Sequence, residues 1–297
     1  MKEIFEVFAP SGSEEAMVEL LKKRFSGMFD RFEVDNMGNL SAVSGEGSLC
    51  IECGMDSVGV MITAREDNCA RFAPVGGVKV CDVLGRTMIF GDGSRGKVCC
   101  DEGKDQKDAK LSDLFIEFKE IYPPIGDFGV IEPEYNEEDC AVTGYGIQNR
   151  IGLAAVCKAI EETRDLGDVT VLFSAQKRLG ARGLTAYFRV HSFDAVITVD
   201  KSGDDGCTIV AKDERAVADR DLRMRLEKIA EEKDIFAETV VSDSNFCMEN
   251  ISVSCGDPCI AIGISVLTGE GEPERVSRSD FGGAVKLLAE IMKERGR

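Results

Sequence analysis

Hydrophobic and polar residues form alternating blocks along the chain. Continuous apolar runs in "SLCIECGMD", "DVTVLFSAQ", "FDAVITVD" and "CIAIGISVL" are typical of strands buried on both faces. Apolar residues at helical spacing in "NRIGLAAVCKAIEETRD" and "SDFGGAVKLLAEIMKERGR" predict helices that alternate with these strands. The pattern predicts an α/β fold with a mostly parallel or mixed sheet and helices on both faces. Near the N-terminus, Ser11 and Glu14 have the spacing of a helix capping box.

The segment from residue 66 to residue 142 departs from this pattern. Short apolar runs alternate there with glycine-rich turns, and no convincing amphipathic helix occurs. We interpret the segment as a small inserted β-barrel. The predicted domains are therefore a discontinuous α/β domain, residues 1–65 and 143–297, and a barrel domain, residues 66–142.

Composition restricts the partners and the compartment. The 297 residues include 54 acidic and 36 basic side chains, a net charge of −18, which argues against binding to nucleic acid or to an anionic membrane surface. The chain has neither an 18-residue apolar run nor a signal-peptide pattern at its N-terminus, so we expect a cytoplasmic protein.

Twelve cysteines fit that compartment as free thiols. Cys50 and Cys53 form a lone CxxC pair inside an apparent strand, where residues three apart face opposite sides. We therefore expect buried thiols here and no structural zinc site.

Two adjacent cations stand out in "LFSAQKRLGARG". Lys177 and Arg178 lie between the end of a predicted buried strand and the start of a predicted helix. Ligands bind at such strand ends in open α/β sheets. Both residues are therefore candidates to hold a small anion or the C-terminal carboxylate of a peptide.

A series of motifs along nearly the whole chain resembles one protein family. "APSGSEE", "EVDNMGNL", "GMDSVGVMI", "RFAPVGG", "LFIEF", "IQNRIGLAAV", "VITVD" and "FGGAVKLLAEI" occur in its order, together with the basic motif. The chain resembles the tetrahedral, glutamyl-type aminopeptidases, which are also labelled endoglucanase or cellulase M. The resemblance implies a zinc-exopeptidase-like fold with an inserted barrel, two metal ions at the active site, and assembly of dimers into dodecamers.

The resemblance also implies which positions would carry the chemistry. Asp56 and Asp200 match the aspartate that orients a ligand histidine and the aspartate that closes a later strand as a metal ligand. The other site positions depart from the family pattern. The first ligand histidine is replaced by Gly54, the bridging aspartate by Gln148, the general base by Lys177, a ligand glutamate by Arg178, and the last ligand histidine by Glu270, with Glu272 or Glu274 as alternatives.

These replacements have an electrostatic logic. In the family site, five acidic groups face two divalent metal ions, which gives a net charge of −1. Here three acids, Asp56, Asp200 and a glutamate, face the two cations Lys177 and Arg178, and the net charge is again −1. We expect the two cations to occupy the metal space and to form ion pairs with Asp56 and Asp200, because unpaired buried acids are costly. Neighbours on a strand point to opposite faces, so one of the two cations is alternatively expected to face solvent.

Three functions are compatible with this site. The first is an aminopeptidase-like protein without metal or peptidase activity, which acts as a scaffold, a regulatory subunit or a binding module, alone as a homo-oligomer or together with an active relative. The second is a working metallopeptidase with zinc, cobalt or manganese on rearranged ligands: Asp200, Asp56, Gln148, a glutamate from 270–274 and a thiolate from Cys53 or Cys247.

The third function is a different enzyme in which Lys177 acts as a desolvated nucleophile. A cysteine hydrolase would have to use His191, the sole histidine, which lies in a predicted loop with no cysteine placed beside it. The absence of an obvious pair of facing carboxylates argues against a glycosidase. Of the three, we expect the protein without metal.

Overall fold

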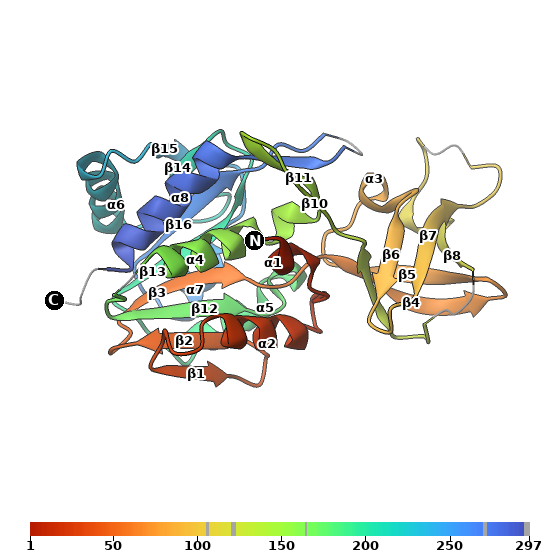
Figure 1. Cartoon of the computed structure of the whole chain (residues 1–297), viewed down its shortest axis with the longest axis horizontal. Coiled ribbons are helices and arrows are strands. Elements are labelled where there is room, and N and C mark those ends of the chain that lie inside the picture. Colours follow the sequence, from red (N-terminus) through yellow and green to blue (C-terminus); the bar gives the residue numbers. More distant parts are fainter. Residues whose placement is uncertain (105–106, 120–122, 164, 270–271, 294–297) are drawn as a thin grey trace.

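The computed structural model describes residues 1–104, 107–119, 123–163, 165–269 and 272–293. A large α/β body lies beside a smaller β-barrel (Figure 1). Each has its own hydrophobic core, and the larger core is built from both faces of the main sheet.

The main sheet has eight strands and mixed direction. Its four central strands, β12, β3, β13 and β16, run parallel, and antiparallel pairs join them to β2 on one side and to β14 on the other. The predicted α/β fold with a mixed sheet is therefore confirmed. In spatial order the strands are β1 (Arg31–Val34), β2 (Leu40–Ser44), β12 (Val169–Ser174), β3 (Leu49–Gly54), β13 (Ala195–Ser202), β16 (Cys259–Ser265), β14 (Cys207–Lys212) and β15 (Glu238–Val241).

Helices cover both faces of this sheet, as predicted. In Figure 1, α4 and α8 cross the near face, and α5 and α7 lie behind it. No helix in the described residues is long and apolar enough to cross a membrane. The helices are α1 (Lys2–Glu6), α2 (Glu15–Arg24), α3 (Val80–Val83), α4 (Ile151–Glu162), α5 (Arg182–Phe188), α6 (Arg220–Glu232), α7 (Met248–Ser254) and α8 (Arg278–Ile291), with 3₁₀ turns η1 (Leu111–Asp113), η2 (Ile147–Asn149) and η3 (Lys177–Leu179).

The inserted barrel is closed and antiparallel. Its strands follow each other in the order β4 (Gly59–Glu66), β5 (Cys69–Val75), β8 (Leu114–Phe118), β7 (Arg95–Cys100), β6 (Thr87–Phe90) and β9 (Phe128–Ile131). Its first strand thus begins seven residues before the predicted start at residue 66. The division of the chain into domains 1–65 with 143–297 and 66–142 stays a prediction.

A small antiparallel sheet follows the barrel in the chain and leads back to the α/β body. It consists of β10 (Glu134–Glu137), β11 (Ala141–Tyr145) and β17 (Glu274–Ser277). Gly144 pairs with Glu274 across β11 and β17, so the first residue of β17 lies next to the turn that precedes α4. This pairing brings a glutamate from the C-terminal part of the chain to the edge of the site described below.

Candidate functional site

The site lies where the central parallel strands end. The last residue of β12, Ser174, pairs with Gly54 at the end of β3, and Val199 of β13 pairs with Cys53. Because parallel strands place their carboxyl ends at one edge of the sheet, the residues that follow β3 and β12 meet the last residues of β13. Lys177 and Arg178 therefore lie beside Asp200, as the motif positions predicted.

The two cations lie on a 3₁₀ turn and not on a strand. Gln176 has a left-handed backbone with φ of 52°, which ends the extended run after β12 and begins η3. Successive side chains on a 3₁₀ turn are about 120° apart, whereas on a strand they point in opposite directions. The expectation that one cation faces solvent is wrong for this reason, because the turn directs both side chains toward Asp200.

Lys177 is enclosed, with only 1% of its side chain exposed. Its ammonium lies 2.9 Å from Glu52 Oε2, 3.3 Å from Thr198 Oγ1 and 3.4 Å from Asp200 Oδ2. Burial alone would lower the pKa of Lys177, but Glu52 and Asp200 raise it instead. An ammonium with three acceptors has no donor left for a ligand, and its raised pKa argues against the nucleophilic role.

Arg178 holds Asp200 from the other side. Its two terminal nitrogens lie 3.2 Å and 3.0 Å from the two carboxylate oxygens, and one of them also donates to Asn149 O at 2.5 Å. Burial alone would raise the pKa of Asp200, but Arg178 and Lys177 hold it at about 2. Asp200 is therefore a carboxylate anion whose two oxygens both contact cationic side chains.

Asp56 is buried, but it does not form the expected ion pair with a cationic side chain. Its Oδ2 accepts hydrogen bonds from the Ser11 hydroxyl and, at 2.8 Å, from the backbone N–H of Arg178. The predicted capping box is wrong as well, because Ser11 binds Asp56, and Glu14 accepts from the N–H groups of Gly12 and Gln176. Ser11 and Asp56 thus fix the N-terminal segment and the basic turn relative to each other.

Gly54 makes room for Lys177. A Cβ atom placed on Gly54 would lie 2.6 Å from Lys177 Cδ and 3.0 Å from Lys177 Cβ, which is shorter than ordinary carbon contacts. Since the ammonium of Lys177 is held by three acceptors, the stem cannot swing away without breaking them. The glycine and the lysine are therefore a matched pair.

A second polar chain lies beside the ion pairs. Glu274 accepts from the backbone N–H and from the side-chain Nε2 of Gln148, both at 2.7 Å, and Gln148 Oε1 accepts from the ammonium of Lys201. Burial raises the pKa of Glu274 against the effect of these hydrogen bonds. Glu274 is thus the glutamate of its loop that holds Gln148, and Glu270 lies outside the described residues.

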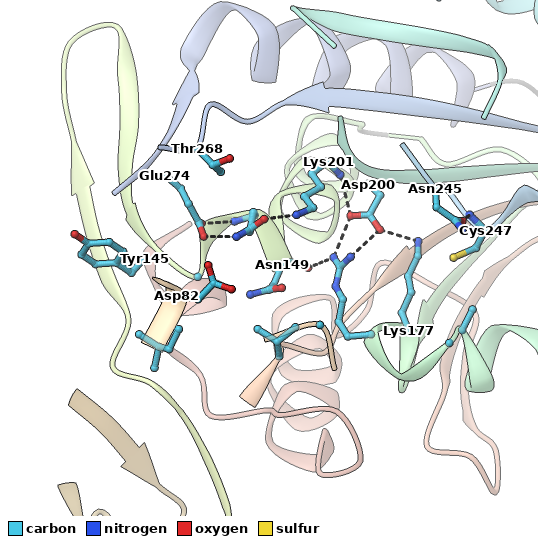
Figure 2. Close-up of a pocket in the computed structure, with 18 of the residues that line it drawn as sticks. Asp82, Tyr145, Asn149, Lys177, Asp200, Lys201, Asn245, Cys247, Thr268 and Glu274 are labelled. Atoms are coloured by element: carbon cyan, nitrogen blue, oxygen red, sulfur yellow. Dashed lines mark hydrogen bonds and ion pairs between the residues drawn. The ribbon is translucent and has the colours of Figure 1, made fainter. Parts of the chain in front are cut away.

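A cavity of about 540 Å³ opens onto both networks, between the α/β body and the barrel. Figure 2 shows Lys177 and Asp200 on one side, Lys201 in the middle, and Glu274 and Tyr145 on the other side. The barrel contributes Asp82, which lies below Glu274 in this view. The site is therefore still open to a small molecule, although its inner wall is made of ion pairs.

The sulfur and imidazole candidates lie in unreactive settings. Cys50 and Cys53 are buried free thiols on β3, as expected. Cys247 borders the cavity, and burial raises its pKa to about 11, so it is a thiol at neutral pH. His191 stacks on the ring of Tyr187, with centroids 4.0 Å apart, and its Nδ1 lies 2.9 Å from the Tyr187 carbonyl oxygen.

Comparison with known proteins agrees with the fold. The sequence profile of the M42 glutamyl aminopeptidases matches residues 38–287. A relative from Acetivibrio thermocellus, provisionally assigned as an aminopeptidase, is 30% identical over 98% of this chain and 97% of its own length. The chain belongs to the M42 glutamyl aminopeptidase family.

Solved structures of aminopeptidases share this architecture. The TET1 peptidase of Pyrococcus horikoshii, which can assemble into a tetrahedron or a large octahedral shell, superposes with a TM-score of 0.88 at 22% identity, over 99% of this chain and 98% of its own. An aminopeptidase from Desulfurococcus kamchatkensis gives 0.88 at 22% identity, over 99% and 93%. At these identities the likeness establishes the M42 fold alone.

The residues present at this M42 site do not fit two metal ions. Gly54 offers no ligand atom and no space for a side chain, and the nitrogens of Lys177 and Arg178 lie against the oxygens of Asp200. A metal ion bound to Asp200 would be repelled by the positive charges of Lys177 and Arg178, which contact the same carboxylate. Within the described ranges, no group of three or more histidine, cysteine or acidic side chains could hold a metal.

Sequence reasoning missed the second acid of the ion pairs, Glu52. It lies inside β3, fully buried, and its other oxygen accepts from Ser174 Oγ at 2.5 Å. A signal was available, because Glu52, Gly54 and Asp56 are two apart and a strand places such residues on one face. Lys201 was also missed, since it follows Asp200 directly and its direction depends on the end of β13.

Proposed function

We propose that this M42 family member works without the family's metal ions and acts as a binding or regulatory subunit, not as a metallopeptidase. The observation that carries the proposal is the pair of cations on Asp200. Lys177 and Arg178 bind the Asp200 carboxylate oxygens that a metal ion would need. Gly54 stands at the position of the first ligand histidine, and the Lys177 stem occupies the space beside it.

Charge compensation supports the same conclusion. A buried carboxylate without a compensating positive charge costs several kcal/mol of folding free energy. Either a metal ion or a cationic side chain can provide that charge. Here Glu52 and Asp200 are compensated by side chains of the chain itself, so neither of these two acids needs an added cation. The site has also lost the acidic residue expected as general base, because Lys177 stands at that position.

A binding role is favoured over that of a passive scaffold because the cavity is retained. It is open to solvent and is lined by residues of the barrel as well as of the α/β body. We further propose that the protein forms a homo-oligomer, since a family relative assembles into closed shells. Co-assembly with an active relative is the other form of association to be tested.

Metal analysis and activity assays on one preparation test this proposal. The protein is purified without chelators and its metal content is measured by inductively coupled plasma mass spectrometry. We expect far less than one zinc, cobalt or manganese ion per chain, no change in melting temperature with EDTA, and no cleavage of aminoacyl substrates after addition of these metals. Stoichiometric metal together with cleavage would establish the metallopeptidase with rearranged ligands instead.

Native mass spectrometry of the protein from its source tests the assembly. We expect a single species made of several copies of this chain. A mixed species with a second M42 chain would identify a regulatory subunit of an active enzyme. A monomer would contradict the oligomeric part of the proposal.

A further inference from the structure

Lys201 lines this cavity, and its ammonium forms no ion pair with any carboxylate in the described part of the chain. Its ammonium donates to Gln148 Oε1, a neutral amide oxygen. Among the described residues, no carboxylate lies within ion-pair distance of it, whereas Lys177 binds both Glu52 and Asp200. A half-buried ammonium with a single neutral acceptor retains two donors for a ligand.

The neighbours of Lys201 keep it in this position. Glu274 binds the backbone and the side-chain nitrogen of Gln148, which fixes the amide so that its oxygen points to Lys201. On the other side, the backbone N–H of Lys201 donates to Asp200 Oδ1 at 2.8 Å. Glu274 therefore orients the acceptor of Lys201 without forming an ion pair with the lysine itself.

Lys201 also borders a second, smaller hollow of about 380 Å³. Six residues line both hollows, so Lys201 lies in the wall that they share. They are Gln148, Arg178, Asp200, Lys201, Asn245 and Thr268.

The charge balance of the smaller hollow is positive. Its charged residues among those described are Arg178, Asp200 and Lys201, and the first two form an ion pair. The other lining side chains are short hydroxyl, amide or apolar groups, among them Ser244, Asn245 and Thr268. Figure 2 shows Thr268 and Asn245 on either side of Lys201. One unpaired positive charge among neutral hydrogen-bonding groups is the composition of an anion site.

We propose that Lys201 binds the carboxylate of a small molecule in this hollow, and that Lys177 and Arg178 do not contact the ligand. A single uncompensated charge matches a carboxylate, which carries one negative charge, better than a phosphate group, which carries about 1.5 to 2 at neutral pH. The ammonium of Lys177 has three protein acceptors, and the two terminal nitrogens of Arg178 bind Asp200 and Asn149. The inference rests on the proposed function in one respect, namely that the cavity serves binding.

Isothermal titration calorimetry at neutral pH and low salt tests the inference with acetate, glutarate and inorganic phosphate as probes. The parent protein is compared with Lys201→Gln, which keeps a hydrogen-bond donor without the charge, and with Lys201→Arg, which keeps the charge. Lys228→Gln on α6 is the matched control, since Lys228 is an exposed lysine paired only within its helix.

We expect a carboxylate probe to bind the parent protein, the control and Lys201→Arg, and to bind Lys201→Gln about tenfold or more weakly. Equal binding to the parent and to Lys201→Gln, or no binding of either carboxylate, would overturn the inference. Tighter binding of phosphate than of both carboxylates would overturn the ligand class. Melting curves of each variant establish that it is folded.

Metal content and hydrolysis are measured on the same samples, which separates this inference from the proposed function. Stoichiometric metal with cleavage would contradict the proposed function, whatever the probes do. A metal-free, inactive protein whose carboxylate binding is unaffected by Lys201→Gln would contradict only the role of Lys201.

Discussion

Replacing Gly54 with alanine tests whether Lys177 fills the space that a ligand side chain would need. The added Cβ would lie 2.6 Å from Lys177 Cδ, against about 3.5–4.0 Å for a favourable carbon contact. The lysine stem has to move by about 1 Å, and its ammonium is held by Glu52, Thr198 and Asp200.

The cost has two sources. Overpacking a buried site by one methyl group lowers the free energy of unfolding by about 1–3 kcal/mol. If the stem moves far enough to separate the ammonium from Glu52, the cost approaches the roughly 3–5 kcal/mol of a broken buried ion pair. We therefore expect Gly54→Ala to destabilise the protein by about 2–4 kcal/mol.

A double-mutant cycle by urea denaturation measures the coupling directly. The second background carries Lys177→Ala, which removes the stem, and Glu52→Gln, which removes the charge that Lys177 compensates. In that background we expect Gly54→Ala to cost less than about 1 kcal/mol, because the contacts with Cγ and Cδ are removed and only the contact with the Cβ of residue 177, at 3.0 Å, remains. The difference between the two backgrounds is the energy of the contact between Gly54 and Lys177.

Gly77→Ala provides the matched control. Gly77 lines the same cavity, but a Cβ placed on it would have no neighbour within 4 Å. We expect a change within about 0.5 kcal/mol for this variant. An equal cost of Gly54→Ala in both backgrounds, or an equal cost at Gly77, would refute the argument that the lysine stem excludes a side chain at residue 54.

Three further predictions follow from the ion pairs. Asp200→Asn should lower the free energy of unfolding in urea by about 3–5 kcal/mol, because it removes the acid shared by Lys177 and Arg178; a loss below about 1 kcal/mol would contradict this role. The low pKa of Asp200, about 2 against an ordinary 3.8, stabilises the fold by about 2 kcal/mol above pH 4, and this contribution should disappear as the pH falls from 4 to 2. The difference in the free energy of unfolding between parent and Asp200→Asn protein should therefore shrink by about 2 kcal/mol across that range, and a constant difference would refute the assignment. Lys177→Glu combined with Arg178→Glu should leave aminopeptidase activity with zinc, cobalt or manganese at the parent level, because Gly54 still supplies no ligand atom and the Gln148 amide is bound to Glu274 and Lys201; activity from these two changes alone would refute the account of the site.

The amino-acid sequence by itself determined the architecture and the position of the site at the strand ends. Its apolar runs predicted buried strands, its glycine-rich middle predicted an inserted barrel, and its motifs placed Lys177, Arg178 and Asp200 at neighbouring strand ends. These are local properties, since periodicity and turn residues act over a few positions of the chain. The family resemblance added the positions at which metal ligands are missing.

Only the tertiary structure decided which groups meet within the site. Glu52 binds Lys177 across 125 positions, Glu274 holds Gln148 across 126, and Ser11 leaves its expected cap to bind Asp56 across 45. Such partners depend on strand register and on one left-handed residue that turns both cations toward Asp200. A local pattern carries no information about them, because register and side-chain direction are settled by the packing of distant segments.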